Sequence, residues 1–151
     1  MDPTNAFSKA LQFVLKWEGG YEYDPNDPGG ETNFGISKHA YPDLDIRNLT
    51  PAQAMGIYKA DYWNKIDGDN QPYPQVLAYF DTAVNDGVSR SLGWIQQAGD
   101  DVKAFLALRR QFYIDLVNKK PTDVKYIRGW LNRVADLTKL IDIESQQDSG
   151  S

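Results

Sequence analysis

The stretch from Glu18 to Ser37, EGGYEYDPNDPGGETNFGIS, interrupts a chain whose other segments carry helical patterns. Residues 21–37 contain two Pro and three Gly, a composition that forbids a helix and suits an irregular loop or a small hairpin. Gly19 and Gly20 follow directly on the preceding helical pattern, and glycine typically ends a helix at that place. The stretch therefore predicts a small irregular or β segment directly after a first helix.

On both sides of this stretch, apolar residues recur with helical period. Thr4 or Asn5 is the expected cap of the first helix, and Thr50 with Gln53 predicts a capping box at the second. The predicted helices cover approximately residues 4–17, 50–63, 76–87, 89–98, 101–118 and 122–140. The expected fold is mostly α, with about six helices in one domain over residues 1–145, followed by a disordered tail over 146–151.

Composition and charge exclude several classes of protein. The 151 residues include 16 Lys and Arg against 21 Asp and Glu, so the net charge of -5 disfavours binding to nucleic acid or anionic lipid. No apolar run approaches the roughly 18 residues of a membrane-spanning helix, so we expect no stable membrane insertion. With no Cys, the chain can form neither a disulfide framework nor a thiolate metal site. We therefore expect one acidic domain that binds neither nucleic acid nor membranes.

The acidity lies in the front half of the chain, where Glu18 is the most informative carboxylate. Glu18 falls in the last turn of the first predicted helix, where the partial negative charge of the helix end disfavours an ionised side chain. Partial burial beside Trp17 and Tyr21 would act in the same direction. A protonated carboxyl is what a general acid needs near neutral pH. The alternative, a solvated glutamate at a frayed helix end, has about equal weight on these grounds alone.

Two further carboxylates and a hydroxyl follow in the same stretch. Asp24 and Asp27 each precede a Pro, a position in which an aspartate often only organises a turn. Together with Glu18, either of them supplies the pair of carboxylates that hydrolysis of a glycosidic bond requires. Thr32 adds a hydroxyl that could position a water molecule. Whether Asp24 or Asp27 is the second carboxylate stays open.

A metal site is not expected. A calcium loop that starts at Asp24 would place Pro28 at position 5 and Gly35 at position 12, where a glutamate is required. The single histidine, His39, has no cysteine partner with which to bind zinc. We therefore predict no metal and no cofactor.

The residues from Glu18 to Ser37 also resemble, almost position by position, the signature E-G-G-Y, D-P-x-D-P-G-G-x-T and G-I-[ST] of glycoside hydrolase family 108. Further similar stretches are DTAVNDG at 81–87, QQA at 96–98 and GWLNRV at 129–134. The family comprises phage endolysins and related bacterial N-acetylmuramidases. The resemblance implies a lysozyme-like α+β fold with a catalytic half over about 1–90 and a half over about 91–145 similar to the family's peptidoglycan domain.

The resemblance also implies roles for individual residues. It makes Glu18 the catalytic acid, with Asp27 and Thr32 as its catalytic partners. Substrate-binding roles are expected for Tyr23, Asp24, Phe34 and Asn85. Asp81 is a further candidate for lining the glycan cleft, although helix pairing for Asp81 and core packing for Phe34 have at least equal weight. Trp130, Asn132 and Arg133 are assigned to packing. Sequence leaves open whether hydrolysis retains or inverts the anomeric configuration.

The expected function is hydrolysis of the β-1,4 bond between N-acetylmuramic acid and N-acetylglucosamine in peptidoglycan glycan strands. The chain is expected to act as a monomer. Because the first residues resemble no secretory signal, we expect synthesis in the cytoplasm of a bacterial host and action in the periplasm or cell wall, as a phage endolysin or a virion-borne lysozyme. A non-catalytic peptidoglycan-binding module and a lytic transglycosylase are the alternatives.

Overall fold

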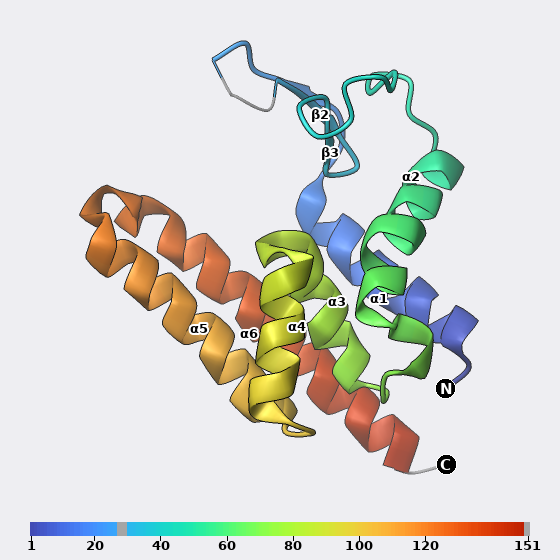
Figure 1. The fold of residues 1–151 in the computed structure, drawn as a ribbon, viewed down its shortest axis with the longest axis vertical. Helices are drawn as coiled ribbons and strands as arrows, with labels where there is room; N and C mark the ends of the chain where they lie inside the picture. The colour runs from blue at the N-terminus through green and yellow to red at the C-terminus, as the bar shows by residue number, and fades with distance from the viewer. Residues whose placement is uncertain (27–29, 150–151) are drawn as a thin grey trace.

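The computed structural model describes residues 1–26 and 30–149, with side chains described through residue 147. Within these residues, six α-helices surround a buried core, and a three-stranded sheet follows the first helix (Figure 1). The helices are α1 (Pro3–Glu18), α2 (Pro51–Tyr58), α3 (Gln75–Asp86), α4 (Val88–Ala98), α5 (Val102–Lys119) and α6 (Val124–Ser149). The strands are β1 (Glu22–Tyr23), β2 (Glu31–Asn33) and β3 (Ile36–Ser37). The mostly α fold with a small sheet after the first helix is confirmed.

The cap of the first helix lies two residues before Thr4, the earlier of the two predicted caps. The side chain of Asp2 caps α1, with its Oδ1 accepting a hydrogen bond from the backbone N of Thr4 at 2.7 Å. Pro3 occupies the first helical turn, where its missing N–H group costs nothing. The prediction that Thr4 or Asn5 caps the helix is therefore wrong. The helix ends as expected at Gly19, which has a φ of 71°.

The second helix starts as predicted and ends differently. Thr50 and Gln53 form the expected capping box. However, α2 ends at Tyr58, and the chain continues in a π-helical turn over Lys59–Trp63 and a 3-10 turn over Asn64–Ile66. The wider turn brings Tyr58, Trp63 and Ile66 to the interior, each with at most 1% of its surface exposed. Burial of these large side chains explains the departure from a regular helix.

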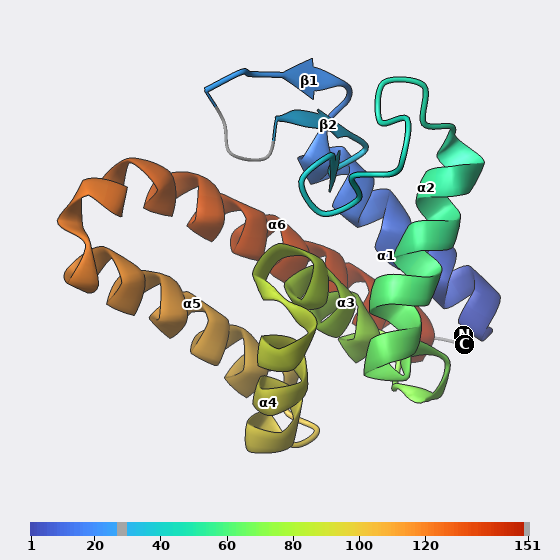
Figure 2. The ribbon, with the colours of Figure 1, turned by 45° about the horizontal axis from the view of Figure 1, so that its top comes forward.

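The sheet stands outside the helices, at the end of α1 (Figure 2). Its order is β1-β2-β3, antiparallel throughout, with Thr32 opposite Glu22 on one side and Ser37 on the other. Phe34 and Gly35 form the two-residue turn between β2 and β3, with φ values of 52° and 77°. Such a turn, with two left-handed residues, matches the natural twist of a hairpin. The buried amide of Asn33 donates to the carbonyl of Ile46 and ties the sheet to the following loop.

Helix α3 lies at the centre of the molecule (Figure 1) and is buried over Val76–Ala83. Its Phe80 packs edge-to-face on Phe7 and Trp63, with ring centroids 5.8 and 5.5 Å apart. Since α1, α4, α5 and α6 all pack on α3, polar groups on this helix can meet partners from several helices.

The last helix is longer than predicted. It was expected to end near residue 140, but α6 continues to Ser149 and so includes residues 146–149, which the sequence analysis assigned to a disordered tail. Ile141 and Glu144 are buried beyond the predicted end, and Lys9 of α1 pairs with Glu144 at 3.0 Å. Burial of Ile141 and the ion pair of Glu144 with α1 favour the extension. No helix among the described residues is long and apolar enough to cross a membrane.

Candidate active site

Glu18 is the last residue of α1, and its side chain is 23% exposed. One of its oxygens, Oε1, accepts a hydrogen bond from Nη1 of Arg133 in α6 at 2.9 Å. The contact joins the residue that ends the first helix to a guanidinium from the last one. The sequence pattern around Glu18 does not predict this cationic partner.

The turn between β2 and β3 also lies against the Glu18 side chain. A Cβ atom at Gly35 would lie 2.8 Å from Cβ and 2.9 Å from Cγ of Glu18, and 2.6 Å from Oη of Tyr58. The Tyr58 hydroxyl in turn donates to the carbonyl of Phe34 at 2.6 Å. Only glycine fits at position 35, since its φ is positive and it has no side chain to place between these groups. The hairpin turn therefore fixes the position of the Glu18 stem.

Two tyrosines lie within electrostatic reach of the same carboxylate. Burial, followed by the negative charge of Glu18, raises the pKa of Tyr58. Burial also raises the pKa of Tyr62, with smaller contributions from Asp61 and Glu18. Both phenols are therefore neutral near pH 7. Glu18 thus faces one cation and two uncharged aromatic hydroxyl groups.

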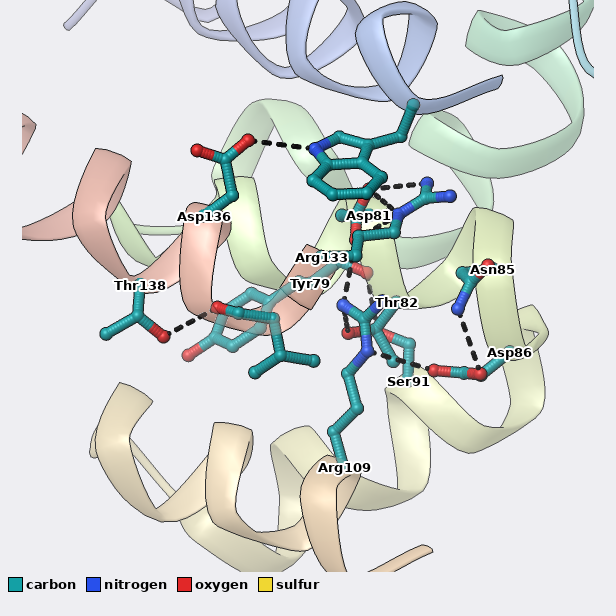
Figure 3. A network of polar contacts seen from close by, with 12 residues as sticks. Tyr79, Asp81, Thr82, Asn85, Asp86, Ser91, Arg109, Arg133, Asp136 and Thr138 are labelled. Carbon is teal, nitrogen blue, oxygen red and sulfur yellow. Dashed lines mark hydrogen bonds and ion pairs between the residues drawn. The ribbon is translucent and has the colours of Figure 1, made fainter. Parts of the chain in front are cut away.

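Behind Glu18 lies a buried arginine–aspartate cluster, formed by Asp81, Asp86, Arg109 and Arg133 (Figure 3). Arg133 donates from Nη2 to Oδ1 of Asp81 at 2.7 Å and from Nε to both carboxylate oxygens at 3.2 Å. Arg109 donates from Nη1 to Oδ2 of the same aspartate at 2.8 Å. Asp81 is 1% exposed and Arg109 is 0% exposed. A fully buried aspartate therefore bridges two arginines from α5 and α6.

At the end of the cluster away from Glu18, Arg109, Asp86 and Tyr113 form a hydrogen-bonded group beside a pocket. Arg109 pairs from Nε with Asp86 at 3.1 Å and donates to the hydroxyl of Tyr113 at 2.8 Å. Burial raises the pKa of Asp86 and raises that of Tyr113 to about 12. Asn85 donates to the same hydroxyl at 2.9 Å. Next to them is a pocket of about 250 Å³, lined by Asn85, Asp86, Arg90, Phe112, Tyr113, Leu116 and Trp130.

The residues predicted as catalytic partners of Glu18 are only partly described. Asp27 lies outside the described residues. Thr32 is half-buried in the central strand β2. Asp24 is exposed, and its Oδ1 accepts from the backbone N of Asn26 at 2.9 Å, which is the turn-organising contact weighed in the sequence analysis. The catalytic roles of Glu18, Asp27 and Thr32 stay predictions.

The predicted substrate-binding residues fall in different places. Tyr23 is 62% exposed on β1. Phe34 lies in the hairpin turn beside Glu18 and packs against the core. Asn85 lies at the opposite end of the arginine–aspartate cluster from Glu18, on the side of the pocket with Trp130. The structure thus brings Phe34 near Glu18 and gives Asn85 a separate pocket.

Sequence reasoning missed the arginines. Arg133 was assigned to packing, but it forms ion pairs with both Glu18 and Asp81, and Arg109 was not singled out at all. A signal was present, because Arg109 falls on the apolar face that Phe105, Phe112 and other residues of α5 form at helical spacing. A charged residue in such a stripe requires a buried partner of opposite charge.

A larger groove of about 430 Å³ runs between α1 and α6, lined by Lys9, Gln12, Phe13, Lys16, Asp136, Lys139, Leu140 and Ile143. This lining does not include Glu18. We therefore place the candidate active site at Glu18, where the chemistry lies, and not in the groove of larger volume. Among the described residues, no group of three or more His, Cys, Asp or Glu side chains could hold a metal ion.

In chemical terms, the site is one partly exposed carboxyl group held by a guanidinium, covered by a hairpin tip and backed by a buried charge cluster. Such a group can take up a proton from solvent and deliver it to a bound substrate, provided that its surroundings tolerate the neutral form.

Comparison with known proteins places the chain among glycoside hydrolases. The family model described as Glycosyl hydrolase 108 matches residues 11–87, and the model described as Predicted Peptidoglycan domain matches residues 88–135. A solved structure titled "Structure of Brucella abortus SagA" is similar at 29% identity and a TM-score of 0.69, over 94% of this chain and 97% of that one. No curated protein matches the chain. Glu18 and Asp81 fall in the first matched segment, and Arg109 and Arg133 fall in the second.

Proposed function

The chain belongs to the glycosyl hydrolase 108 family, and on this premise we propose that it cleaves the β-1,4 bond between N-acetylmuramic acid and N-acetylglucosamine. Its glycoside hydrolase segment and its predicted peptidoglycan domain together make it a peptidoglycan hydrolase. We further assign the cleaved bond, between N-acetylmuramic acid and N-acetylglucosamine, and the general acid, Glu18. The observation that carries it is the position of Glu18, at a helix end, partly exposed and fixed by Arg133 and Gly35.

In the proposed reaction, Glu18 gives its proton to the glycosidic oxygen as the bond from that oxygen to the anomeric carbon breaks. A second carboxylate stabilises the positive charge that develops on the sugar ring or activates the attacking water. We assign this role to Asp27, with Asp24 as the other candidate and Thr32 as the group that holds the water. The Asp24 contact with Asn26 favours a turn-forming role for Asp24 and so supports this assignment.

The setting of the reaction is also a proposal. We propose that the protein acts as a monomer on the glycan strands of a bacterial wall, as a phage endolysin or a virion-borne lysozyme. Its net charge of -5 gives it no general attraction to polyanions, so recognition has to come from local contacts.

The test is digestion of purified peptidoglycan by the wild type and by Glu18→Gln, followed by mass spectrometry of the products. We expect Glu18→Gln to lower the rate by about 10²–10⁴-fold, the range for loss of a general acid. Glu22→Gln is the matched control, because Glu22 is an exposed glutamate on the adjacent strand β1. It should cleave at the wild-type rate.

The products separate the alternatives. Muramidase action gives reducing N-acetylmuramic acid ends, whereas a lytic transglycosylase gives anhydro ends. If Glu18→Gln digests peptidoglycan as fast as the wild type, Glu18 is not the acid. If neither protein digests it but both still bind it, the chain is a binding module.

A further inference from the structure

The ion pair between Glu18 and Arg133 poses a chemical problem. A general acid has to carry a proton before it acts, yet a guanidinium at 2.9 Å favours the ionised form of its carboxylate. The proposed reaction therefore requires that another group take up the charge of Arg133. This inference rests on the proposed role of Glu18 as an acid.

The arginine–aspartate cluster contains such a group. Its two arginines and two aspartates balance in formal charge without Glu18. With Glu18 ionised, the assembly carries one net negative charge, and with Glu18 protonated it is neutral. The aspartates therefore already neutralise the two arginines, and Arg133 does not need Glu18 as its counter-ion.

Arg133 makes stronger contacts with Asp81 than with Glu18. Asp81 accepts from Nη2 at 2.7 Å and from Nε at 3.2 Å, whereas Glu18 accepts a single bond from Nη1. Asp81 is also 1% exposed, so water does not screen its attraction for the guanidinium, whereas the Glu18 side chain is 23% exposed. Asp81 is therefore the main counter-ion of Arg133, and Glu18 is the weaker partner that solvent can reach.

We propose that Asp81 is a positioning residue that acts on Glu18 through Arg133. Asp81 orients the guanidinium and neutralises its charge, so that Nη1 holds the Glu18 carboxyl in place and still lets it take up a proton. The proton comes from solvent and goes to the glycosidic oxygen. Asp81 acts on Glu18 through Arg133 and takes no direct part in the proposed reaction.

Among the described residues, the other groups that face Glu18 carry no charge near neutral pH. Tyr58 and Tyr62, from α2 and the π-helical turn, are neutral because burial raises the pKa of each. The hairpin turn contributes Phe34 and Gly35, which carry no charge. Arg133 is thus the charged group in direct contact with Glu18, with Asp81 behind it.

The test changes the charges one at a time. Asp81→Asn keeps a side chain of the same size and leaves Arg133 without its main counter-ion, so we expect Glu18 to bind its proton at a pH lower by about one unit. The upper limb of the pH profile for digestion should move to lower pH by the same amount, so that the rate at a fixed pH on that limb falls about tenfold.

Arg133→Met removes the cation beside Glu18. It should move both the proton binding of Glu18 and the upper limb of the profile to higher pH.

The double variant Asp81→Asn with Arg133→Met identifies the path of the effect. If Asp81 acts through Arg133, the double variant should follow Arg133→Met, because Asp81 has no effect once the guanidinium is gone. Independent, additive shifts would overturn the proposal. Should Asp81→Asn fail to fold, Asp81→Ser takes its place, with the same downward shift expected and its absence overturning the proposal. The absence of an upward shift in Arg133→Met overturns the proposal as well.

Asp86→Asn is the matched control. Asp86 belongs to the same cluster, with a side chain that is 5% exposed, but it pairs with Arg109 and not with Arg133. A merely structural role predicts that both aspartate variants lower the melting temperature and leave the pH profile unchanged. We expect both to lower the melting temperature, and we expect Asp81→Asn to shift the pH profile clearly more than Asp86→Asn, whose charge lies one arginine further from Glu18.

The closing measurement does not depend on catalysis. Carbon-13 NMR of the Glu18 carboxyl, assigned by the loss of its signal in Glu18→Gln, follows proton binding directly in each variant. If the shifts occur but peptidoglycan is not cleaved, the proposed reaction is wrong and the coupling to Asp81 is right. If peptidoglycan is cleaved with a Glu18-dependent rate but the shifts are absent, the coupling is wrong and the proposed reaction stands.

Discussion

Two regions of opposite character meet at Glu18: the strand segment over residues 22–37 and the buried arginine–aspartate cluster. In the described part of the strand segment, both residues of β1 are exposed, and Tyr23 has 62% of its surface in solvent. In the cluster, Asp81 and Arg109 have 1% and 0%. The first region depends on backbone geometry, and the second depends on paired charges.

The difference shows how one carboxylate is controlled from two sides. The hairpin turn limits where the Glu18 stem can lie, because Gly35 leaves no free space around it. The cluster acts on the other end of the side chain, through the bond from Arg133. Substitutions in the two regions should therefore have different signatures, and the expected effects can be ranked by size.

The largest effect should come from the buried cluster, on replacing Arg109 by Met. The change leaves Asp86 without its cation in a buried site and removes one of two cations from Asp81. Loss of one partner from a buried ion pair typically costs about 3–5 kcal/mol of the free energy of unfolding. Urea unfolding monitored by circular dichroism measures it.

An exposed ion pair provides the control for this variant. Lys16 pairs with Asp136 at 2.7 Å, but its side chain is 64% exposed, so Lys16→Met should cost no more than about 1 kcal/mol. Equal costs for the two variants would mean that burial does not distinguish the cluster from a surface pair.

Sequence predicted the two regions to different extents. The signature from Glu18 to Ser37 is continuous, so its turns and its candidate acid were evident from neighbouring residues. The cluster joins Asp81, Arg109 and Arg133, which are far apart in the chain and meet only because α5 and α6 pack on α3. Each residue alone fits an ordinary charged position on a helix. Only its place in an apolar stripe indicates burial.

The same distinction holds for the fold. The capping box at Thr50, the stop at Gly19 and the positions of six helices follow from local chemistry and are confirmed. The π-helical turn before Trp63 and the extension of α6 past Ile141 were not predicted, because both depend on burial against distant elements. Local patterns predicted the elements, and tertiary packing decided where two of them end.

The next effect concerns the hairpin turn, on replacing Gly35 by Ala. The new Cβ would approach Tyr58 and Glu18 to within 2.6–2.9 Å, and the φ of 77° adds backbone strain. We expect a cost of about 2–4 kcal/mol from strain and overpacking together, with loss of digestion because Glu18 is displaced. Thermal unfolding and the digestion rate measure the two consequences.

Gly30→Ala separates strain from contact. Gly30 has a similar φ of 68°, but a Cβ there meets no atom within 4 Å. This variant should cost about 1–2 kcal/mol from backbone strain alone. If it impairs folding and digestion as much as Gly35→Ala does, the close approach to Glu18 has no separate importance.

The smallest effect should come from Tyr58→Phe, which removes only the hydroxyl that joins the helical part to the hairpin turn. That hydroxyl donates to the carbonyl of Phe34 at 2.6 Å, and Tyr58 is 1% exposed, so the carbonyl loses a buried partner. We expect a cost of about 1–2 kcal/mol, seen as a lower urea midpoint. Tyr126→Phe is the control, since Tyr126 is 49% exposed and should lose little stability. Hydrogen exchange in Tyr58→Phe tests which part is stabilised. If exchange rises at the backbone amides of β2 and β3 but not in α5 or α6, the hydroxyl stabilises the hairpin and not the cluster. A rise in all four elements would instead show that the hairpin and the cluster unfold as one unit.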